Sequence, residues 1–273
     1  MANASIHYMP PAADGILAPS RTNRKIGVVM IHGFTSVPES IRPWATGLAE
    51  AGAAVSLPLL SGHGTRWQDM NRVPAGQWRD DVRQAVDSLH YQGEPVDEIV
   101  VAGLSMGATL ALDAAAHRKV SHVLLVNPAL RLKTLDAWGG ALAPLLHRVI
   151  PSVKPVADDI ARPGVTEGAY PRTPVAAVAE LAALIRTLVP QLSSVAAPIT
   201  VFRADQDHVI PESSMQVLRA GATNTAQYTE HRLSDSFHVA TLDYDAEYII
   251  EESVRALAAP LHTTQSSIER GRR

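Results

Sequence analysis

The feature of this 273-residue sequence that most constrains its fold is the alternation of short apolar runs with longer alanine-rich segments. Nearly continuous apolar runs of this length are typical of strands that are buried on both faces of a sheet. Such runs lie at 25–32, 53–60, 98–102, 122–127 and 198–202. A further segment, 228–233, alternates polar and apolar residues, which is typical of an edge strand.

Segments with a helical pattern separate these runs. They lie at about 38–51, 76–91, 106–117, 176–188, 212–220 and 244–259. Strands that alternate with helices imply βαβ crossovers and a mostly parallel sheet. Functional sites of such folds lie at the carboxyl ends of the strands. The sequence therefore predicts an α/β fold with its site at that edge.

One connection is far longer than a normal loop, namely residues 131–197. Its many prolines allow only part of it to be regular helix. We therefore expect a cap over the carboxyl edge of the sheet, followed by a return helix. The expected organisation is an N-terminal segment 1–24, a core of 25–130 and 198–262, the cap and return helix 131–197, and a flexible tail 263–273.

Composition excludes several classes of function. A formal net charge of −3 provides no basic surface for nucleic acid or anionic membrane. The absence of cysteine excludes disulfides, thiolate metal sites and a cysteine nucleophile. No run of about 20 apolar residues suggests a membrane span, and the N-terminus lacks the basic and apolar regions of a signal peptide. We therefore expect a cytoplasmic protein with no nucleic-acid partner and no stable membrane insertion.

A candidate nucleophile follows the apolar run 98–102. The stretch Gly103-Leu-Ser-Met-Gly107 opens the helical pattern of 106–117, so that Ser105 occupies the apex of a strand–turn–helix. Glycines on both sides permit the close backbone approach that a strained nucleophile elbow requires. The alternative is an incidental glycine-rich turn between a strand and a helix.

A serine nucleophile needs a base and a carboxylate that orients the base. In this architecture the chain order is serine, acid, histidine. Two acids, Asp205 and Asp207, follow the run 198–202. We favour Asp207, which lies where the chain turns into the next helix, whereas Asp205 is expected to shape the turn.

Four histidines are candidates for the base, and His238 fits best. It lies in the loop after the last predicted strand, whereas His231 lies inside that strand and His262 lies at the start of the tail. His208 adjoins the acid in sequence, which leaves it poorly placed to be oriented by that acid. The alternative reading of His238 is an ordinary surface-loop histidine.

The oxyanion that forms during acyl transfer needs backbone donors. One is expected from the N–H of Met106 at the start of the elbow helix. The other is expected from Phe34, in the loop His32-Gly-Phe-Thr-Ser36 after the first apolar run. We interpret His32 and His63 as structural. The sequence holds no H-E-x-x-H motif, P-loop or dinucleotide fingerprint, so neither a metal nor a cofactor is expected.

Five motifs in one order carry a resemblance to a known family. These are 32–35, 60–65, 103–107, 207–211 and 237–243, and together they resemble the bacterial carboxylesterases and monoacylglycerol lipases of the α/β-hydrolase superfamily. The resemblance spans roughly 25–259. It implies an eight-stranded, mostly parallel sheet with a small cap after the sixth strand.

By matching motif position, the resemblance also implies a catalytic triad of Ser105, Asp207 and His238, with the amides of Phe34 and Met106 as the oxyanion hole. Two positions near the nucleophile depart from the family pattern: Ala108 and Ser36 stand where many relatives have glycine. These departures leave the width of the pocket open.

The expected function is hydrolysis of carboxylic esters through an acyl-enzyme, with monoacylglycerols and other short- to medium-chain esters as substrates. Acyl transfer to an acceptor other than water, or a non-catalytic protein that binds an acyl ligand, are the alternatives. A monomer or homodimer is expected. An apolar helical stripe in the insertion is expected either to roof the pocket or to pack on the edge of the sheet: Leu135, Trp138, Leu142, Leu145, Leu146 and Val149.

Overall fold

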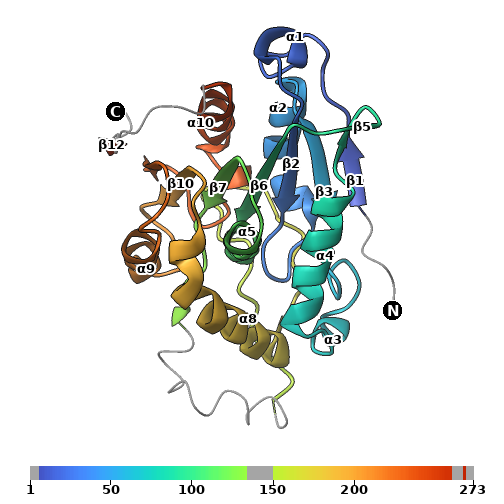
Figure 1. Ribbon diagram of the computed structural model, residues 1–273. Coiled ribbons are helices and arrows are strands. Elements are labelled where there is room, and N and C mark those ends of the chain that lie inside the picture. The colour runs from blue at the N-terminus through green and yellow to red at the C-terminus, as the bar shows by residue number, and fades with distance from the viewer. Residues whose placement is uncertain (1–5, 134–149, 260–266, 269–273) are drawn as a thin grey trace.

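The computed structural model describes residues 6–133, 150–259 and 267–268. A twisted sheet runs through the centre of the molecule, and helices cover both of its faces (Figure 1). The sheet has eight strands in the order β1-β3-β2-β6-β7-β10-β11-β12. These strands are β1 (Ile6–Met9), β2 (Ile26–Ile31), β3 (Ala54–Pro58), β6 (Glu98–Leu104), β7 (His122–Val126), β10 (Ile199–Ala204), β11 (Tyr228–Leu233) and β12 (Ser267–Ile268).

All neighbouring strands are parallel except β1, which pairs antiparallel with β3. Every residue of β2, β3, β7 and β10 is buried, which explains why their sequences read as continuous apolar runs. The predicted mostly parallel, eight-stranded α/β-hydrolase sheet is therefore confirmed.

Helices form two layers, each over its own apolar cluster. Trp78 is fully buried on the face covered by α4 (Ala75–Asp87), α5 (Met106–His117), α8 (Val175–Leu188) and α9 (Ser213–Gly221). Trp44 is fully buried on the opposite face, covered by α2 (Arg42–Glu50) and α10 (Ala246–Ala258). The remaining short elements are α1 (Pro19–Thr22), η1 (Pro38–Ile41), α3 (Trp67–Met70), β4 (His90–Tyr91), β5 (Glu94–Pro95), β8 (Ser152–Val153), β9 (Thr173–Pro174), η2 (Val189–Ser194) and η3 (Ala240–Leu242).

The two outermost strands come from segments in which no strand was predicted. β1 lies in the N-terminal segment 1–24, and β12 lies in the tail 263–273. Because β12 pairs with β11, the segment 228–233 is not the edge strand that its alternating pattern predicted. Short edge strands of this kind depend on a neighbour for their hydrogen bonds, so their own sequences carry little signal.

The long insertion follows β7, which is the fifth strand of the sheet in chain order after β1, β2, β3 and β6, and not the sixth as expected. Its described part contains the β8–β9 hairpin and the return helix α8. The apolar stripe from Leu135 to Val149 lies outside the described residues.

The segment Val175–Ser194 is long and apolar enough, by length and composition alone, to cross a membrane, so the expectation that no such run exists was wrong. In this fold the segment packs against neighbouring helices, and α8 buries residues such as Leu181, Leu184 and Leu188 in the core. About 39% of the tested window is buried, and core helices of globular proteins can pass the same test of length and hydropathy.

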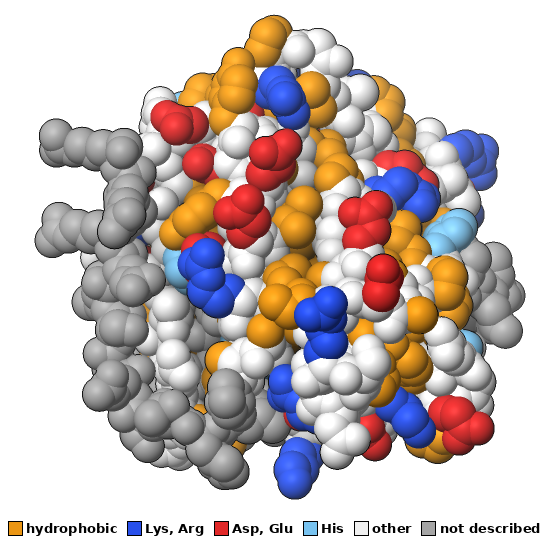
Figure 2. Space-filling view, turned by 90° about the horizontal axis from the view of Figure 1, so that it is seen from above, with side chains coloured by type: hydrophobic (Ala, Val, Ile, Leu, Met, Phe, Trp, Pro, Cys, Tyr) orange, Lys and Arg blue, Asp and Glu red, His pale blue; other side chains and the backbone are white. Residues whose placement is uncertain are grey.

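Charged side chains of both signs are interspersed on the end of the molecule that is seen from above (Figure 2). Elsewhere among the described residues, oppositely charged side chains form ion pairs, such as Arg42 with Glu39 and Arg24 with Glu98. This face therefore has an electrostatic potential of mixed sign and is neither uniformly positive nor uniformly negative.

Candidate active site

A pocket of about 220 Å³ lies at the carboxyl ends of the strands. Ser105, His238 and Phe34 all contribute to its wall, and they come from three segments that are far apart in sequence. Its other lining residues are Gly33, Leu104, Ala129, Leu132, Lys133, Val153, Val156, Ala157, Asp159, Glu167, Thr173, Val175, Val178, Leu181, His208, Val209 and Ile210.

Ser105 occupies the sharp turn between β6 and α5, with φ 56° and ψ −114°. A positive φ is unfavourable for a residue with a side chain, so the surrounding packing must hold this turn. The flanking glycines make that packing possible. A Cβ on Gly103 would lie 2.3 Å from the carbonyl carbon of Gly107, and a Cβ on Gly107 would lie 2.0 Å from the carbonyl oxygen of Ile31.

The loop after β2 runs directly beside Ser105. A Cβ on Gly33 would lie 3.9 Å from the Cβ of Ser105, so the backbone that leads into Phe34 is adjacent to the nucleophile candidate. Met106 begins α5 immediately after Ser105. Its N–H is therefore at the positive end of a helix, where negative charge is favoured.

His238 and Asp207 form a buried pair beside the pocket. The ring Nδ1–H of His238 donates to Oδ2 of Asp207 at 2.9 Å. The other carboxylate oxygen accepts the backbone N–H groups of Val209 and Ile210, each at 2.8 Å. This arrangement leaves Nε2 of His238 as the ring nitrogen that carries the lone pair.

Burial and charge act in opposite directions on this pair. Burial by itself would raise the pKa of Asp207, but His238 and then Arg203 outweigh it and hold the pKa at about 2. Burial likewise would lower the pKa of His238, but Asp207, and then Glu167 and Asp159, raise it above 6.5. Asp207 is therefore ionised throughout the neutral range, which is the state needed to orient an imidazole.

The competing candidates from the sequence lie elsewhere. Asp205 accepts from Nε of Arg232 at 2.7 Å, so it forms a surface ion pair and does not reach His238. His208 donates from Nδ1 to Asp159 at 2.8 Å. His231 is buried between Phe202 and Tyr248, away from the pocket wall. His262 lies outside the described residues.

His32 and His63 are buried and are not among the residues that line the pocket. Nδ1–H of His32 donates to the carbonyl of Gly33 at 2.9 Å, and its Nε2 accepts the N–H of Leu60 at 3.2 Å. Because Nε2 accepts a hydrogen bond, the ring is neutral, and burial lowers the pKa of His32 to about 4. His63 packs edge-on against His32, with 4.8 Å between ring centroids, and does not line the pocket.

Two acidic residues in the pocket wall escaped the sequence reasoning because both lie in the long insertion. Oδ2 of Asp159 accepts the backbone N–H groups of His208 and His238, each at 3.1 Å. Glu167 is buried, and burial raises the pKa of its carboxyl although the Asp158 N–H and the charge of His238 oppose this. No local motif marks either residue.

Asn127 was not predicted as a site residue, although it directly follows the buried strand β7. The carboxyl end of such a strand is a position that favours functional residues. Its side-chain N–H donates to the carbonyl of His238 at 2.7 Å, and its side-chain oxygen accepts the N–H of Ala204 at 2.9 Å. Asn127 thereby ties the His238 loop to β10.

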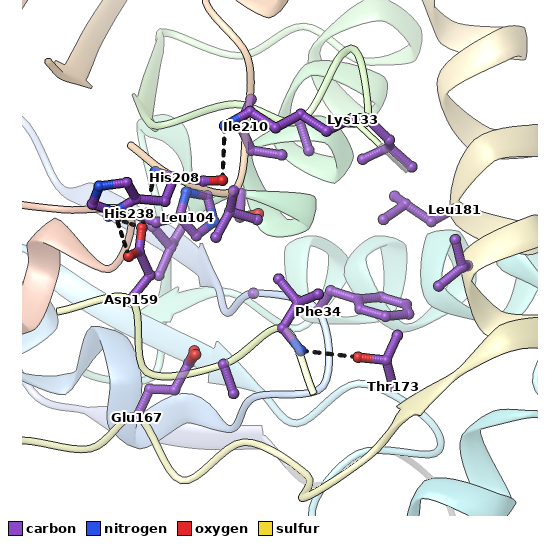
Figure 3. Close-up of a pocket in the computed structure, with 18 of the residues that line it drawn as sticks. Phe34, Leu104, Lys133, Asp159, Glu167, Thr173, Leu181, His208, Ile210 and His238 are labelled. Atoms are coloured by element: carbon purple, nitrogen blue, oxygen red, sulfur yellow. Dashed lines mark hydrogen bonds and ion pairs between the residues drawn. The ribbon is translucent and has the colours of Figure 1, made fainter. Parts of the chain in front are cut away.

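The pocket has a polar side and an apolar side. Asp159, His208 and His238 gather on one side, whereas Phe34 and Leu181 face each other on the other (Figure 3). Valines from the insertion and from α8 extend the apolar wall, namely Val153, Val156, Val175 and Val178. Among the described residues, no group of three or more histidine, aspartate or glutamate side chains is arranged to hold a metal ion.

Comparisons with known proteins give a consistent picture. Residues 22–244 match the family model described as serine aminopeptidase, S33. The sequence is 36% identical over 239 residues to a thermostable monoacylglycerol lipase of Bacillus sp. (strain H-257), covering 86% of this chain and 92% of that protein.

Solved structures agree with these sequence matches. A structure from the study of LipS and LipT, two metagenome-derived lipolytic enzymes, superposes with a TM-score of 0.81 at 30% identity, covering 94% of this chain and 98% of the other. The monoacylglycerol lipase of Paleococcus ferrophilus superposes with a TM-score of 0.74 at 16% identity over 94% and 99% of the two chains, which is a likeness of fold.

Proposed function

This chain belongs to the serine aminopeptidase S33 family of α/β hydrolases, and we propose that it hydrolyses carboxylic esters, monoacylglycerols above all, with Ser105 as nucleophile. The observation that carries the assignment of residues is the buried Asp207–His238 pair beside a pocket that also contains Ser105 at a strained strand–helix turn. Hydrolysis of carboxylic esters is the activity that the relatives and the fold support.

In the first half of the reaction, the hydroxyl oxygen of Ser105 attacks the ester carbonyl carbon, and Nε2 of His238 accepts the hydroxyl proton. The imidazolium that forms is stabilised by ionised Asp207 through the Nδ1–H bond of 2.9 Å. The backbone N–H groups of Phe34 and Met106 stabilise the negative charge on the carbonyl oxygen. His238 then returns its proton to the departing alcohol.

In the second half, water attacks the acyl group on Ser105, and His238 again accepts the proton. The tetrahedral intermediate uses the same two backbone donors, and its collapse releases the carboxylic acid and the free Ser105 hydroxyl. Acyl transfer to another alcohol would use the same residues and differ only in the acceptor. A non-catalytic binding protein has no use for a strained serine that lines the same pocket as an oriented histidine.

The two sides of the pocket suggest how a monoacylglycerol would bind. The apolar wall around Phe34 and Leu181 suits one acyl chain, whereas the carboxylates of Asp159 and Glu167 would accept hydrogen bonds from the free hydroxyls of the glycerol. A volume of about 220 Å³ is small for a ligand site. One acyl chain therefore suits it better than the three chains of a triacylglycerol.

A fluorophosphonate probe tests the assignment of the nucleophile. It should label the wild-type protein and the matched control Ser193→Ala, whose serine is exposed, but not Ser105→Ala. Ester turnover should fall by about 10⁴- to 10⁶-fold in Ser105→Ala only. A Ser105→Ala protein that kept a tenth of the activity would overturn the assignment.

We expect a cytoplasmic enzyme that is a monomer or a homodimer and needs neither metal nor cofactor. Cell fractionation, light scattering, and assays in the presence of a chelator measure these properties.

A further inference from the structure

Arg203 is a charged residue inside the apolar interior of the sheet. It lies on β10, all of whose residues are buried, and only 4% of its side chain is exposed. Burying a guanidinium group is costly unless hydrogen bonds and an opposite charge compensate for the lost water. An apolar residue would suit this strand position better, so the contacts of Arg203 must account for its presence here.

The guanidinium group of Arg203 is directed at the loop that carries Asp207. Its Nη1 donates to Oδ2 of Asp207 at 2.5 Å, and its Nη2 donates to the carbonyl of Ile210 at 2.8 Å. Its Nε donates to Glu212 at 3.3 Å, and Nη1 also reaches the side-chain oxygen of Asn127 at 3.5 Å. Arg203 and His238 therefore share the same oxygen of Asp207.

Orientation of the carboxylate does not by itself explain Arg203. The other oxygen of Asp207 already accepts two backbone N–H groups, from Val209 and Ile210, which fix the plane of the carboxylate. Arg203 adds a full positive charge next to Oδ2 of Asp207, which is the oxygen that accepts the Nδ1–H of His238. A cation at that position opposes the formation of imidazolium.

The balance of charge around His238 shows why such a cation is useful. The charged and titratable groups that face His238 or its direct partners from the surrounding elements are Asp207, Asp159, Glu167, His208, Lys133, Glu212 and Arg203. Asp207, Asp159 and Glu167 all favour the protonated ring. An imidazole held too firmly as imidazolium could not accept the proton of Ser105 at neutral pH.

We infer that Arg203 is a positioning residue that acts through Asp207, and that its charge offsets the carboxylates around His238 so that the ring remains a base near neutral pH. This inference rests on the proposed triad. Arg203 itself contacts Asp207 and neither the substrate nor the reacting atoms.

The acidic limb of the pH profile of kcat/KM tests the inference. Arg203→Gln removes the charge, so the limb should move to higher pH by about one unit. Arg203→Lys keeps the positive charge but cannot donate to both Asp207 and the carbonyl of Ile210 as the planar guanidinium does. Its acidic limb should therefore remain within about 0.3 pH units of wild type while kcat falls. The matched control is Arg232→Gln, because Arg232 lies opposite Arg203 in the β10–β11 pairing but binds Asp205.

The position of the limb does not depend on how much protein is folded, and fluorophosphonate titration counts the active sites in each sample. Arg203→Met is made beside Arg203→Gln so that a neutral variant that folds is available. The inference would be wrong if the acidic limb of Arg203→Gln and Arg203→Met stayed at its wild-type pH. It would also be wrong if the limb of Arg203→Lys moved as far as the limb of these neutral variants.

The same data separate this inference from the proposed function. If the wild-type enzyme shows no acidic limb, or the probe does not label Ser105, the proposed triad itself is wrong. If wild type shows both properties and the neutral variants keep its profile, the triad stands and only the role of Arg203 is wrong.

Discussion

Asp159 lies in the insertion between β7 and α8, yet its carboxylate accepts the backbone N–H of His238 at 3.1 Å. The same oxygen accepts the N–H of His208, and its partner oxygen accepts Nδ1–H of that residue. A single side chain thus joins the insertion to both loops that carry the proposed acid and base. The backbone adds a further link, since the N–H of Val239 donates to the carbonyl of Asp159 at 3.0 Å.

Replacing Asp159 should therefore damage catalysis without removing any reacting group. Asp159→Ala removes the acceptor of the part-buried N–H of His238 and of the exposed N–H of His208, and each hydrogen bond to a charged group contributes about 1.5–3 kcal/mol. We expect kcat/KM to fall by about 10- to 100-fold, measured with a short-chain ester. Asp87→Asn, which loses only an exposed ion pair with Arg118, should retain the wild-type rate, and equal losses in both variants would contradict this role.

The two acids after β10 should differ sharply in their effect on rate. Asp207→Asn keeps the shape of the side chain but favours the wrong tautomer of His238, so kcat should fall by several orders of magnitude, on the order of 10⁴-fold. Asp205→Asn breaks only the pair with Arg232 and should cost less than about tenfold. Steady-state kinetics on both variants decide the matter, and the reverse ranking would make Asp205 the acid.

Stability at acidic pH should depend on a histidine outside the active site. His122 is buried on β7 beside Thr200, and burial lowers its pKa to about 4. Its contribution to folding is complete above the unfolded pKa of about 6.5 and is lost as pH falls towards 4, at about 1.4 kcal/mol per pH unit. The free energy of unfolding at pH 5 should therefore lie below that at pH 7 by about 2 kcal/mol from this group.

His122→Gln removes the titrating ring while keeping a group that can hydrogen-bond to Thr200. Urea unfolding at pH 7 and pH 5 should show a smaller difference in this variant than in wild type. An exposed histidine provides the control, and His117→Gln, on the surface of α5, suits that purpose. Identical pH dependence in wild type and His122→Gln would show that the pKa of His122 is the same in the folded and unfolded states, which would contradict the lowered value.

The apolar wall should set the preference for acyl-chain length. Leu181 projects from α8 towards Phe34 across the pocket (Figure 3). Leu181→Trp fills part of that space, so kcat/KM should decline for medium chains relative to acetyl esters, by roughly fourfold for each methylene that no longer fits. An acyl series assayed on both proteins measures the ratio, and an unchanged preference would place the acyl chain elsewhere.

The sequence by itself determined the class of fold and supplied the candidates for the proposed triad. Its continuous apolar runs identified the buried strands, because a strand covered on both faces must be apolar throughout. The glycines around Ser105 predicted a sharp turn, because a nucleophile elbow brings backbone atoms too close for a Cβ. The structure shows such close approaches at Gly103 and Gly107. Asp207 and His238 could be chosen because chain order and loop position restrict where an acid and a base can follow that elbow.

Only the tertiary structure decided what surrounds that pair. Arg203, Asn127, Asp159 and Glu167 come from two strand ends and an insertion, and no local pattern predicts that they converge on Asp207 and His238. The edge strands β1 and β12 could not be predicted from their own sequences either, because they form by pairing with β3 and β11. Local sequence encodes burial and backbone geometry, whereas the charge around a histidine depends on which distant segments the fold brings within a few ångströms of it.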